Sequence, residues 1–327
     1  MILVTGGAGF IGSNLVAALA SRGAEIAICD RLGTDDKWRN IAKRELAGLI
    51  EPEALDGFLA EHRGAIEAIF HMGAISATTA RDADLVFRTN FALSLRLWEW
   101  CAEHGARFIY ASSAAVYGDG GAGFDDDPAP EALARLRPLN AYGTSKLMFD
   151  RRVARLAATG AARPRQWAGL RFFNVYGPNE YHKGEQRSVA VQVHERAQRG
   201  EPSILFKSHH PDYPDGGQKR DFVWVGDVVD VMAWLLDRPD VTGLFNLGTG
   251  QARSFVDLAG AVFAARGERP KIQFVDTPPE LRPRYQYFTE ARMARLRAAG
   301  YDRPFTSLET GIARYVKDYL AAPDPYL

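Results

Sequence analysis

Ile2-Leu3-Val4-Thr5-Gly6-Gly7-Ala8-Gly9-Phe10-Ile11-Gly12 is the stretch of sequence that decides the fold. Its apolar first residues predict a buried strand and its glycines predict a turn. The apolar spacing through Leu15, Val16 and Leu19 then predicts a helix. A glycine turn between a strand and a helix places the pyrophosphate of a dinucleotide at the helix N-terminus. The stretch therefore predicts a dinucleotide-binding unit.

The context of the glycines supports this interpretation. Gly6 permits the tight turn, Gly9 lets the backbone approach the phosphates, and Gly12 lets the helix lie close to the strand. A second predicted strand, Glu25–Cys29, ends at Asp30. That position is close to the offset of roughly 20 residues expected for the acid that binds the adenosine ribose. The alternative is a glycine turn in another kind of α/β protein, which would not require this acid.

Strand and helix patterns alternate over the first half of the chain. Strands are predicted at Ala68–His71, Arg107–Ala111 and Ala168–Val175, with helices through Leu93–Cys101 and from about Tyr142 between them. This alternation predicts an α/β fold built on a doubly wound parallel sheet of the Rossmann type. Ligands in such folds bind beyond the carboxyl ends of the strands, so we expect the functional residues there.

The pattern changes after this point. A helix through Val189–Ala197, a loop rich in Pro, Gly and Asp at 208–218, a strand-like segment at Phe222–Val225, a helix from about Ser254 and a strand at Lys271–Val275 follow. They predict a smaller C-terminal α/β domain for the substrate. The predicted division is 1–175 and 221–250 for the dinucleotide-binding domain, with 176–220 and 251–327 for the substrate domain.

Composition excludes several classes of function. The 327 residues carry 40 Lys and Arg against 40 Asp and Glu, which gives no sign of nucleic-acid binding or of a basic membrane anchor. No apolar stretch is long enough for a membrane span, and no signal peptide is predicted. Cys29 and Cys101 both lie in apolar segments, which indicates reduced thiols in a cytoplasmic protein. His209-His210 lies in a loop without other ligands at metal spacing, so no metal site is expected.

Tyr142-Gly143-Thr144-Ser145-Lys146 places a tyrosine and a lysine on one face of a predicted helix. A neighbouring ammonium favours the phenolate, so we expect a lowered Tyr142 pKa and a usable base for a hydroxyl proton. A solvated Tyr/Lys pair is the alternative. Ser112-Ser113 at the end of a predicted strand, together with the glycine turn, favours the catalytic interpretation.

Together these features resemble the extended short-chain dehydrogenase/reductase superfamily and, within it, the ADP-glyceromanno-heptose 6-epimerases. The resemblance runs nearly end to end. The matching strings are Gly6-Gly7-Ala8-Gly9-Phe10-Ile11-Gly12-Ser13-Asn14, Ala68-Ile69-Phe70-His71, Tyr110-Ala111-Ser112-Ser113-Ala114, Phe173-Asn174-Val175-Tyr176-Gly177-Pro178-Asn179-Glu180, His182-Lys183-Gly184, Lys219-Arg220-Asp221-Phe222-Val223 and Phe245-Asn246-Leu247-Gly248-Thr249-Gly250. The string at residues 182–184 is the most particular to the heptose epimerases.

The resemblance implies an isomerase that inverts C6 of an ADP-activated glycero-manno-heptose for the lipopolysaccharide core, through oxidation to a ketone and re-reduction with a bound nicotinamide cofactor. It implies that Tyr142 takes the hydroxyl proton, that Ser113 holds the oxygen and that Lys146 orients the cofactor ribose. A second acid/base group is useful on the other face of the ketone, and the resemblance gives that role to Lys183. It also implies an ADP-sugar as partner and a homo-oligomer.

The resemblance further implies NADP as the cofactor, while the residues leave NAD open. Asp30 favours NAD, because a carboxylate accepts hydrogen bonds from ribose hydroxyls, whereas Arg31 and Lys37 could accommodate a 2′-phosphate. The other expected cofactor contacts are Gly6, Gly9, Phe10, Ile11, Gly12, Met72, Gly73, Ala74, Ile75, Ser76, Asn90, Lys146, Val175 and Lys183.

For the substrate, the resemblance assigns Arg220 to the diphosphate, a task that suits a guanidinium fork. It assigns Phe206 and Tyr285 to the adenine and phosphates. The full expected set is Ser113, Asn174, Glu185, Gln192, Phe206, Lys207, Arg220 and Tyr285. Glu185 and Gln192 stand where the family has a small hydroxyl and a histidine, which leaves the sugar open.

The sequence also bears on three other functions. Dehydratases of the superfamily carry an Asp-Glu pair after the strand-end serine, whereas this chain has Ala114-Ala115, which cannot transfer a proton. Another nucleotide-sugar epimerase or reductase, such as a 4-epimerase, is the main alternative. A non-catalytic dinucleotide sensor is disfavoured, because Tyr142 and Lys146 are both retained.

Overall fold

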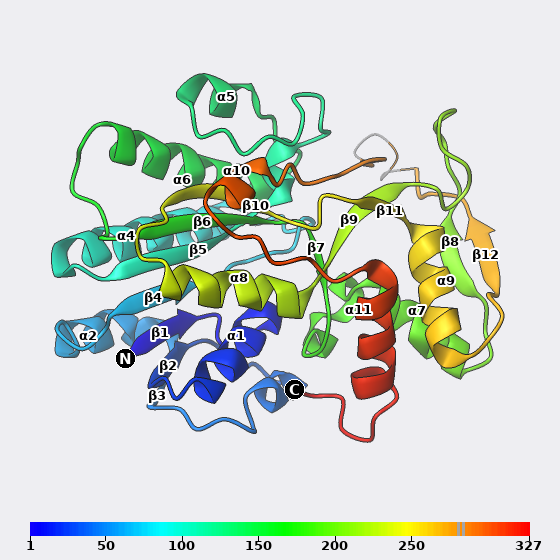
Figure 1. Ribbon diagram of the computed structural model, residues 1–327, viewed down its shortest axis with the longest axis horizontal. Helices are drawn as coiled ribbons and strands as arrows, with labels where there is room; N and C mark the ends of the chain where they lie inside the picture. Colours follow the sequence, from blue (N-terminus) through cyan, green and yellow to red (C-terminus); the bar gives the residue numbers. More distant parts are fainter. Residues whose placement is uncertain (280–281, 283–284) are drawn as a thin grey trace.

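A computed structural model describes residues 1–279, 282 and 285–327, and it is built around one central sheet (Figure 1). The sheet has seven strands in the order β10-β6-β5-β4-β1-β2-β3, all parallel. Their bounds are Ile2–Thr5 (β1), Ile26–Cys29 (β2), Gly48–Ile50 (β3), Ala68–His71 (β4), Arg107–Ser113 (β5), Trp167–Phe172 (β6) and Gly243–Leu247 (β10). The predicted doubly wound α/β fold is confirmed.

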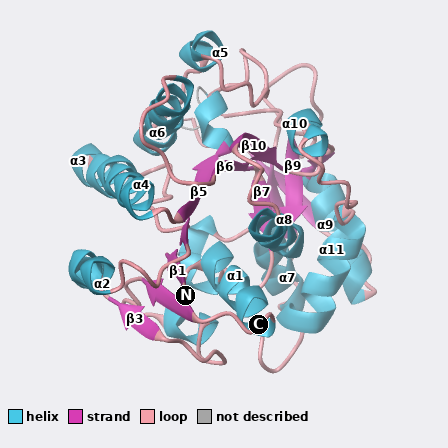
Figure 2. Cartoon of the chain, turned by 60° about the vertical axis from the view of Figure 1, so that its left-hand side comes forward, coloured by secondary structure: helices cyan, strands magenta, loops and turns pink. Residues whose placement is uncertain are grey.

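Helices cover both faces of this sheet (Figure 2). One face carries α2 (Leu55–Glu61), α3 (Ala83–Phe87), α4 (Leu93–His104) and α6 (Ala141–Ala158), and the other carries α1 (Phe10–Ser21) and α8 (Val225–Asp237). The strands supply both cores by alternation, since Leu3 packs into the first core and Val4 into the second. Such buried strands read as continuous apolar runs, which is why the sequence predicts them clearly.

The second part of the chain forms two small sheets. The strands β7 (Asn174–Tyr176), β9 (Lys219–Trp224) and β11 (Ala252–Ser254) make one, with β9 in the middle, and β8 (Ser203–Phe206) pairs with β12 (Ile272–Val275) in the other. The helices α7 (Val189–Gln198), α9 (Phe255–Arg266) and α11 (Leu308–Arg314) pack with them around a third core. These elements lie together at one end of the molecule (Figure 1).

The remaining elements are short. They are α5 (Pro130–Arg135), α10 (Ala294–Ala298), the 3₁₀ turns η1 (Asp36–Asn40), η2 (Pro52–Ala54), η4 (Ala114–Tyr117) and η5 (Tyr181–Gln186), and the π-helical turns η3 (Arg88–Ala92) and η7 (Tyr315–Leu320). Within the described ranges, no helix combines the length and the apolar character that crossing a bilayer requires.

Two predicted strands differ from the structure. The predicted strand Ala168–Val175 is two strands, because the chain leaves the central sheet at Phe173 and enters the three-stranded sheet as β7. The strand predicted at Phe222–Val225 starts at Lys219 and pairs with β7 and β11. In the first case the apolar run continues across the change of partner, and in the second the added residues Lys219, Arg220 and Asp221 are charged, so hydrophobicity alone shows neither.

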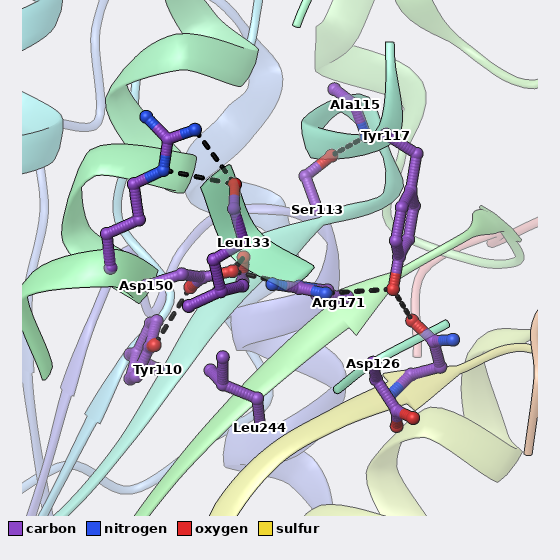
Figure 3. A network of polar contacts seen from close by, with 12 residues as sticks. Tyr110, Ser113, Ala115, Tyr117, Asp126, Leu133, Asp150, Arg171 and Leu244 are labelled. Carbon is purple, nitrogen blue, oxygen red and sulfur yellow. Dashed lines mark hydrogen bonds and ion pairs between the residues drawn. The ribbon is translucent and has the colours of Figure 1, made fainter. Parts of the chain in front are cut away.

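A buried polar network ties β5, β6 and α6 together (Figure 3). Asp150 on α6 accepts hydrogen bonds from the hydroxyls of Tyr110 and Ser112 and from Nε of Arg171, each at 2.9 Å. Arg171 also donates to the Tyr117 hydroxyl at 2.9 Å. The Asp150 and Arg171 side chains are both completely buried. The network fixes the helix that carries Tyr142 and Lys146 against the ends of β5 and β6.

Replacing Arg171 with methionine should be strongly destabilising, because it leaves the Asp150 carboxylate buried without its cation. We expect a loss of about 3–5 kcal/mol in the free energy of unfolding, measured by urea denaturation. The double variant with Asp150→Asn should recover part of the loss. Arg238→Met, which removes an exposed pair with Asp240, is the matched control and should change stability far less. An Arg171→Met protein that unfolds at the same urea concentration as the wild type would contradict the proposed contribution of this network to stability.

Candidate active site

The glycine turn between β1 and α1 lines a cavity of about 840 Å³ at the carboxyl ends of the central strands. Gly6 has a φ of +67°, and a Cβ there would lie 2.5 Å from the backbone of Gly73. A Cβ at Gly12 would lie 2.1 Å from the Gly6 carbonyl oxygen. No described side chain caps α1 at Gly9, so the first amides of the helix are available to an anion. The turn fits the pyrophosphate of a dinucleotide.

Asp30, at the end of β2, is held by three donors. Its carboxylate accepts from the backbone amides of Ala8 at 2.9 Å and Arg31 at 2.8 Å, and from Nζ of Lys37 at 2.7 Å. Lys37 on η1 therefore balances the charge of Asp30. The Arg31 side chain pairs with Glu53 and does not line the cavity.

The segment after β4 forms another wall. Met72, Gly73, Ala74 and Ser76 line the cavity. Ile75 does not: its amide donates to Oδ1 of Asn90 at 2.9 Å, and Nδ2 of Asn90 donates to the Ile75 carbonyl at 3.0 Å and to Oγ of Ser145 at 3.1 Å. The buried Asn90 thus connects this wall to α6, and it is not itself a cavity residue.

Ser113, Tyr142 and Lys146 meet on one side of the cavity. Ser113 ends β5, while Tyr142 and Lys146 lie one turn apart on α6. The helix start is fixed by Asn140, whose Oδ1 accepts from the Gly143 amide at 2.8 Å. The predicted Ser/Tyr/Lys group is therefore assembled at the edge of the sheet where ligands bind in this fold.

The pKa of Tyr142 shifts in the direction opposite to the one expected from the sequence. Burial raises the pKa of Tyr142, and a hydrogen bond with Ser113 partly offsets the rise. Burial also lowers the pKa of Lys146 to about 8, although the charge of the Asp150 carboxylate acts in the opposite direction. The prediction that the Tyr142 pKa falls is therefore wrong. Burial disfavours the charged form of both side chains, the phenolate of Tyr142 and the ammonium of Lys146.

Lys183 reaches the same cavity from a different element, the turn η5. Its Nζ lies 5.4 Å from the centre of the Phe10 ring, beside the glycine turn. Burial lowers the pKa of Lys183, and the buried carboxylate of Glu180 raises it. A buried lysine with a lowered pKa can serve as a base as well as an acid.

The structure separates the predicted substrate residues into two groups. Ser113, Asn174 and Glu185 line the cavity. Gln192 is exposed on α7 and donates to the Arg187 carbonyl at 3.1 Å, so it does not. The other predicted substrate residues that lie away from the cavity are Phe206, Lys207, Arg220 and Tyr285.

This second group is centred on Arg220 of β9. The Arg220 guanidinium is held by the carbonyls of Lys219 at 2.8 Å and Gln286 at 2.5 Å. It lies 5.6 Å from the ring centre of Tyr285 and 5.7 Å from that of Phe255, which also lines the cavity. Phe206 contacts Tyr285 edge to face at 6.2 Å. Phe255 therefore joins the Arg220 group to the cavity.

Several lining residues were missed. The set is Thr78, Ala111, Ser112, Phe172, Phe173, Tyr176, His182, Gln186, Arg187, Ser188, Val189, Phe222 and Phe255. His182, next to Lys183 in the matching string, carried a usable signal. Phe255 carried none, because only the pairing of β9 with β11 brings it to Phe222, with ring centres 5.5 Å apart.

The loop at 208–218 packs as an aromatic cluster. His210 lies 5.4 Å from the ring of Tyr213 and 5.1 Å from that of Tyr287, and its Nδ1 accepts from the Asp212 amide at 3.2 Å. Over the residues that the structure describes, no three His, Cys, Asp or Glu side chains are grouped to hold a metal ion.

Known proteins match this architecture. The model of the NAD dependent epimerase/dehydratase family matches residues 2–248. A protein of Nitratidesulfovibrio vulgaris (strain DP4), named ADP-L-glycero-D-manno-heptose-6-epimerase, is 50% identical, with 100% of each chain covered. One of the same name from Fusobacterium nucleatum is 46% identical, again over 100% of each chain.

Solved structures agree. The Helicobacter pylori ADP-L-glycero-D-manno-heptose-6-epimerase superposes with a TM-score of 0.79 at 28% identity, covering 98% of this chain and 96% of that one. The Thermus thermophilus UDP-glucose 4-epimerase in complex with NAD gives 0.75 at 29% identity, covering 98% and 99%. The chain therefore belongs to the NAD dependent epimerase/dehydratase family and, within it, to the group of isomerases formed by the ADP-L-glycero-D-manno-heptose-6-epimerases.

Proposed function

We propose that this protein inverts C6 of an ADP-activated glycero-manno-heptose, by oxidising the C6 alcohol to a ketone and reducing it on its other face. One observation carries the proposal: two proton-transfer groups, Tyr142 and Lys183, reach the cavity beside the glycine turn from different elements. A second proton-transfer group is useful in an inversion, because it can serve the other face of the ketone while the first group stays on its own side.

The cavity fits a nicotinamide dinucleotide. The glycine turn and the open N-terminus of α1 suit its pyrophosphate, and Asp30 with Lys37 suits its adenosine ribose. A nicotinamide held there would supply reversible hydride transfer at C6, so the reaction would have no net redox change.

The protein's own groups move the protons and hold the substrate oxygen. Tyr142 takes the hydroxyl proton on one side, and Ser113, hydrogen-bonded to the phenol, holds the oxygen. Lys146 orients the cofactor ribose, and its charge offsets the cost of forming a buried phenolate at Tyr142. Lys183 exchanges the proton on the other side.

The nucleotide of the substrate is assigned to the Arg220 group. A guanidinium between two aromatic rings suits a diphosphate next to an adenine. Lys207 directly follows Phe206 at the end of β8 and adds a positive charge near this group. Its ammonium is paired with the Asp276 carboxylate at 3.5 Å. Asn174 and Glu185, which line the cavity, are then the residues that face the sugar.

NADP is proposed as the cofactor, with NAD as the alternative. The ammonium of Lys37 already neutralises one oxygen of Asp30, so a 2′-phosphate would meet a cation as well as the acid. The division into domains at 1–175 with 221–250 and at 176–220 with 251–327 stays a prediction, as do the homo-oligomer and the cytoplasmic location.

The identity of the substrate can be tested with a direct assay of conversion. Purified protein incubated with ADP-D-glycero-D-manno-heptose should change the C6 configuration, followed by NMR, and should leave UDP-glucose unconverted. Turnover of UDP-glucose without change in the heptose would select a 4-epimerase instead.

Tyr142→Phe and Lys183→Met should each lower the rate of epimerisation by about 10²–10⁴-fold, since each removes one proton-transfer group. The rate is measured by the same NMR assay. Lys317→Met, which changes an exposed lysine of η7, is the matched control and should behave as the wild type. Wild-type turnover by Lys183→Met would remove the two-base mechanism.

Lys37→Met should reduce the preference for NADP. Loss of one charge-assisted hydrogen bond to a phosphate costs about 1.5–3 kcal/mol, or tenfold or more in relative affinity. The ratio of NADP to NAD retained after equilibration with an equal mixture of the two measures this change. An unaltered ratio would show that Lys37 does not contact the 2′-phosphate.

A further inference from the structure

Lys183 stands at the end of a short segment, Pro178–Lys183, here called the lysine segment. Its residue Asn179 has a φ of +71°, the one positive φ outside glycine among the described residues. This conformation costs free energy for a residue with a side chain, least for asparagine, and contacts with neighbouring elements stabilise it. The position of the Lys183 amine therefore depends on what fastens this segment.

The inner side of the lysine segment is fastened to the cofactor turn. Nδ2 of Asn14 on α1 donates to the Pro178 carbonyl at 3.0 Å, and Nδ2 of Asn179 donates to Oγ of Ser13 at 3.0 Å. Nδ2 of Asn40 on η1 donates to the carbonyls of Ala8 at 2.8 Å and Asn179 at 3.1 Å. Glu180 of the same segment is held separately, since its carboxylate accepts from the hydroxyls of Ser188 at 2.7 Å and Tyr315 at 3.0 Å.

The outer side is covered by residues 324–327, here called the tail segment. The Leu327 amide donates to Oδ1 of Asn179 at 3.0 Å, and the Tyr181 hydroxyl donates to the Pro325 carbonyl at 2.8 Å. The rings of Tyr181 and Tyr326 meet edge to face with centres 5.2 Å apart. Tyr326 is only 8% exposed, so its contact with Tyr181 is buried.

The tail segment is also fastened to η1 and the residues after it. Nζ of Lys43 donates to the Tyr326 carbonyl at 2.7 Å and pairs with the Asp324 carboxylate at 2.9 Å. The guanidinium of Arg39 lies 4.4 Å from the centre of the Tyr326 ring. Tyr326 is thus placed between η1, which carries Lys37 and Asn40, and the lysine segment.

We propose that the tail segment, through Tyr326, is a positioning element for Lys183: it clamps the lysine segment against η1 and so holds the amine at the substrate. The inference rests on the proposed role of Lys183 and adds residues that touch neither cofactor nor substrate. Tyr326 and Tyr181 act through the lysine and are not catalytic residues.

Release of the tail segment should have a signature in the pH dependence. Burial keeps the Lys183 pKa low; the charged groups near it are Glu180 on its own segment and, around the neighbouring His182, Lys37 and Asp35 of the η1 region together with Asp30. Water admitted by a loosened segment removes part of the desolvation and raises the Lys183 pKa. The limb of the pH–rate profile that Lys183 controls then moves to higher pH. This holds whether the reaction begins with the neutral or with the protonated amine.

Tyr326→Ala tests this in the full-length protein. The rate constant kcat for epimerisation should fall roughly tenfold to hundredfold with KM unchanged, since a small misplacement of a catalytic group has that effect. The limb set by Lys183 should move to higher pH. Tyr326→Phe keeps the ring for Arg39 and Tyr181, and the Tyr326 hydroxyl donates to no described group, so this variant should behave as the wild type.

Tyr181→Phe provides a second test should Tyr326→Ala fail to fold, because it removes one hydrogen bond and keeps the ring. It should give a smaller fall in kcat and a pH shift of the same sign, whereas Tyr319→Phe on η7, whose hydroxyl bonds to no described group, should give neither. An unshifted pH limb in both Tyr181→Phe and any folded Tyr326→Ala protein would overturn the inference. Lys183→Met separates the two levels: if that variant is fully active the proposed function fails, and if it is inactive while the tyrosine variants match the wild type only the positioning fails.

Discussion

The contact of backbone with backbone at the glycine turn is the constraint on which the rest of the structure depends. Gly6 lies against Gly73 and Gly12 lies against Gly6, at separations that leave no room for a Cβ. This packing brings the ends of β1 and β4 together and aims the start of α1 into the cavity. The Ser/Tyr/Lys group and Lys183 are useful only because they line the space that this turn bounds.

A second level of order comes from buried polar groups that touch no ligand. Asp150 and Arg171 fix α6 under Tyr142 and Lys146, and Asn90 joins α6 to the wall after β4. Asn40 connects the glycine turn with the lysine segment in the same way. Each of these groups lies between two elements that are distant in sequence. The active site is therefore held by a frame of hydrogen bonds rather than by apolar packing alone.

Much of this could be predicted from the sequence, and the failures have physical causes. Strand ends such as Asp30, Ser113 and the glycine turn could be located, because buried parallel strands are apolar runs that stop abruptly at polar residues. The break at Phe173 could not, since the apolar run crosses it. The sign of the Tyr142 pKa shift also failed, because spacing along a helix reveals a neighbouring charge but not the desolvation that opposes it.

The residues proposed to bind the substrate, and their neighbours, are the least predictable from the sequence. Phe255 and Arg220 come together only through the pairing of β9 with β11, a long-range contact that no local pattern encodes. Ile75 and Asn90 lie in the expected places along the chain, but they bond to each other and do not line the cavity.

The contact between Lys43 and Tyr326 joins positions 283 residues apart. During synthesis, Lys43 emerges from the ribosome long before Tyr326, so the contact between η1 and the tail segment forms late. Closing so large a loop is slow, and non-local contacts of this kind delay folding. A nascent chain can therefore form its glycine turn well before the lysine segment is held from its outer side.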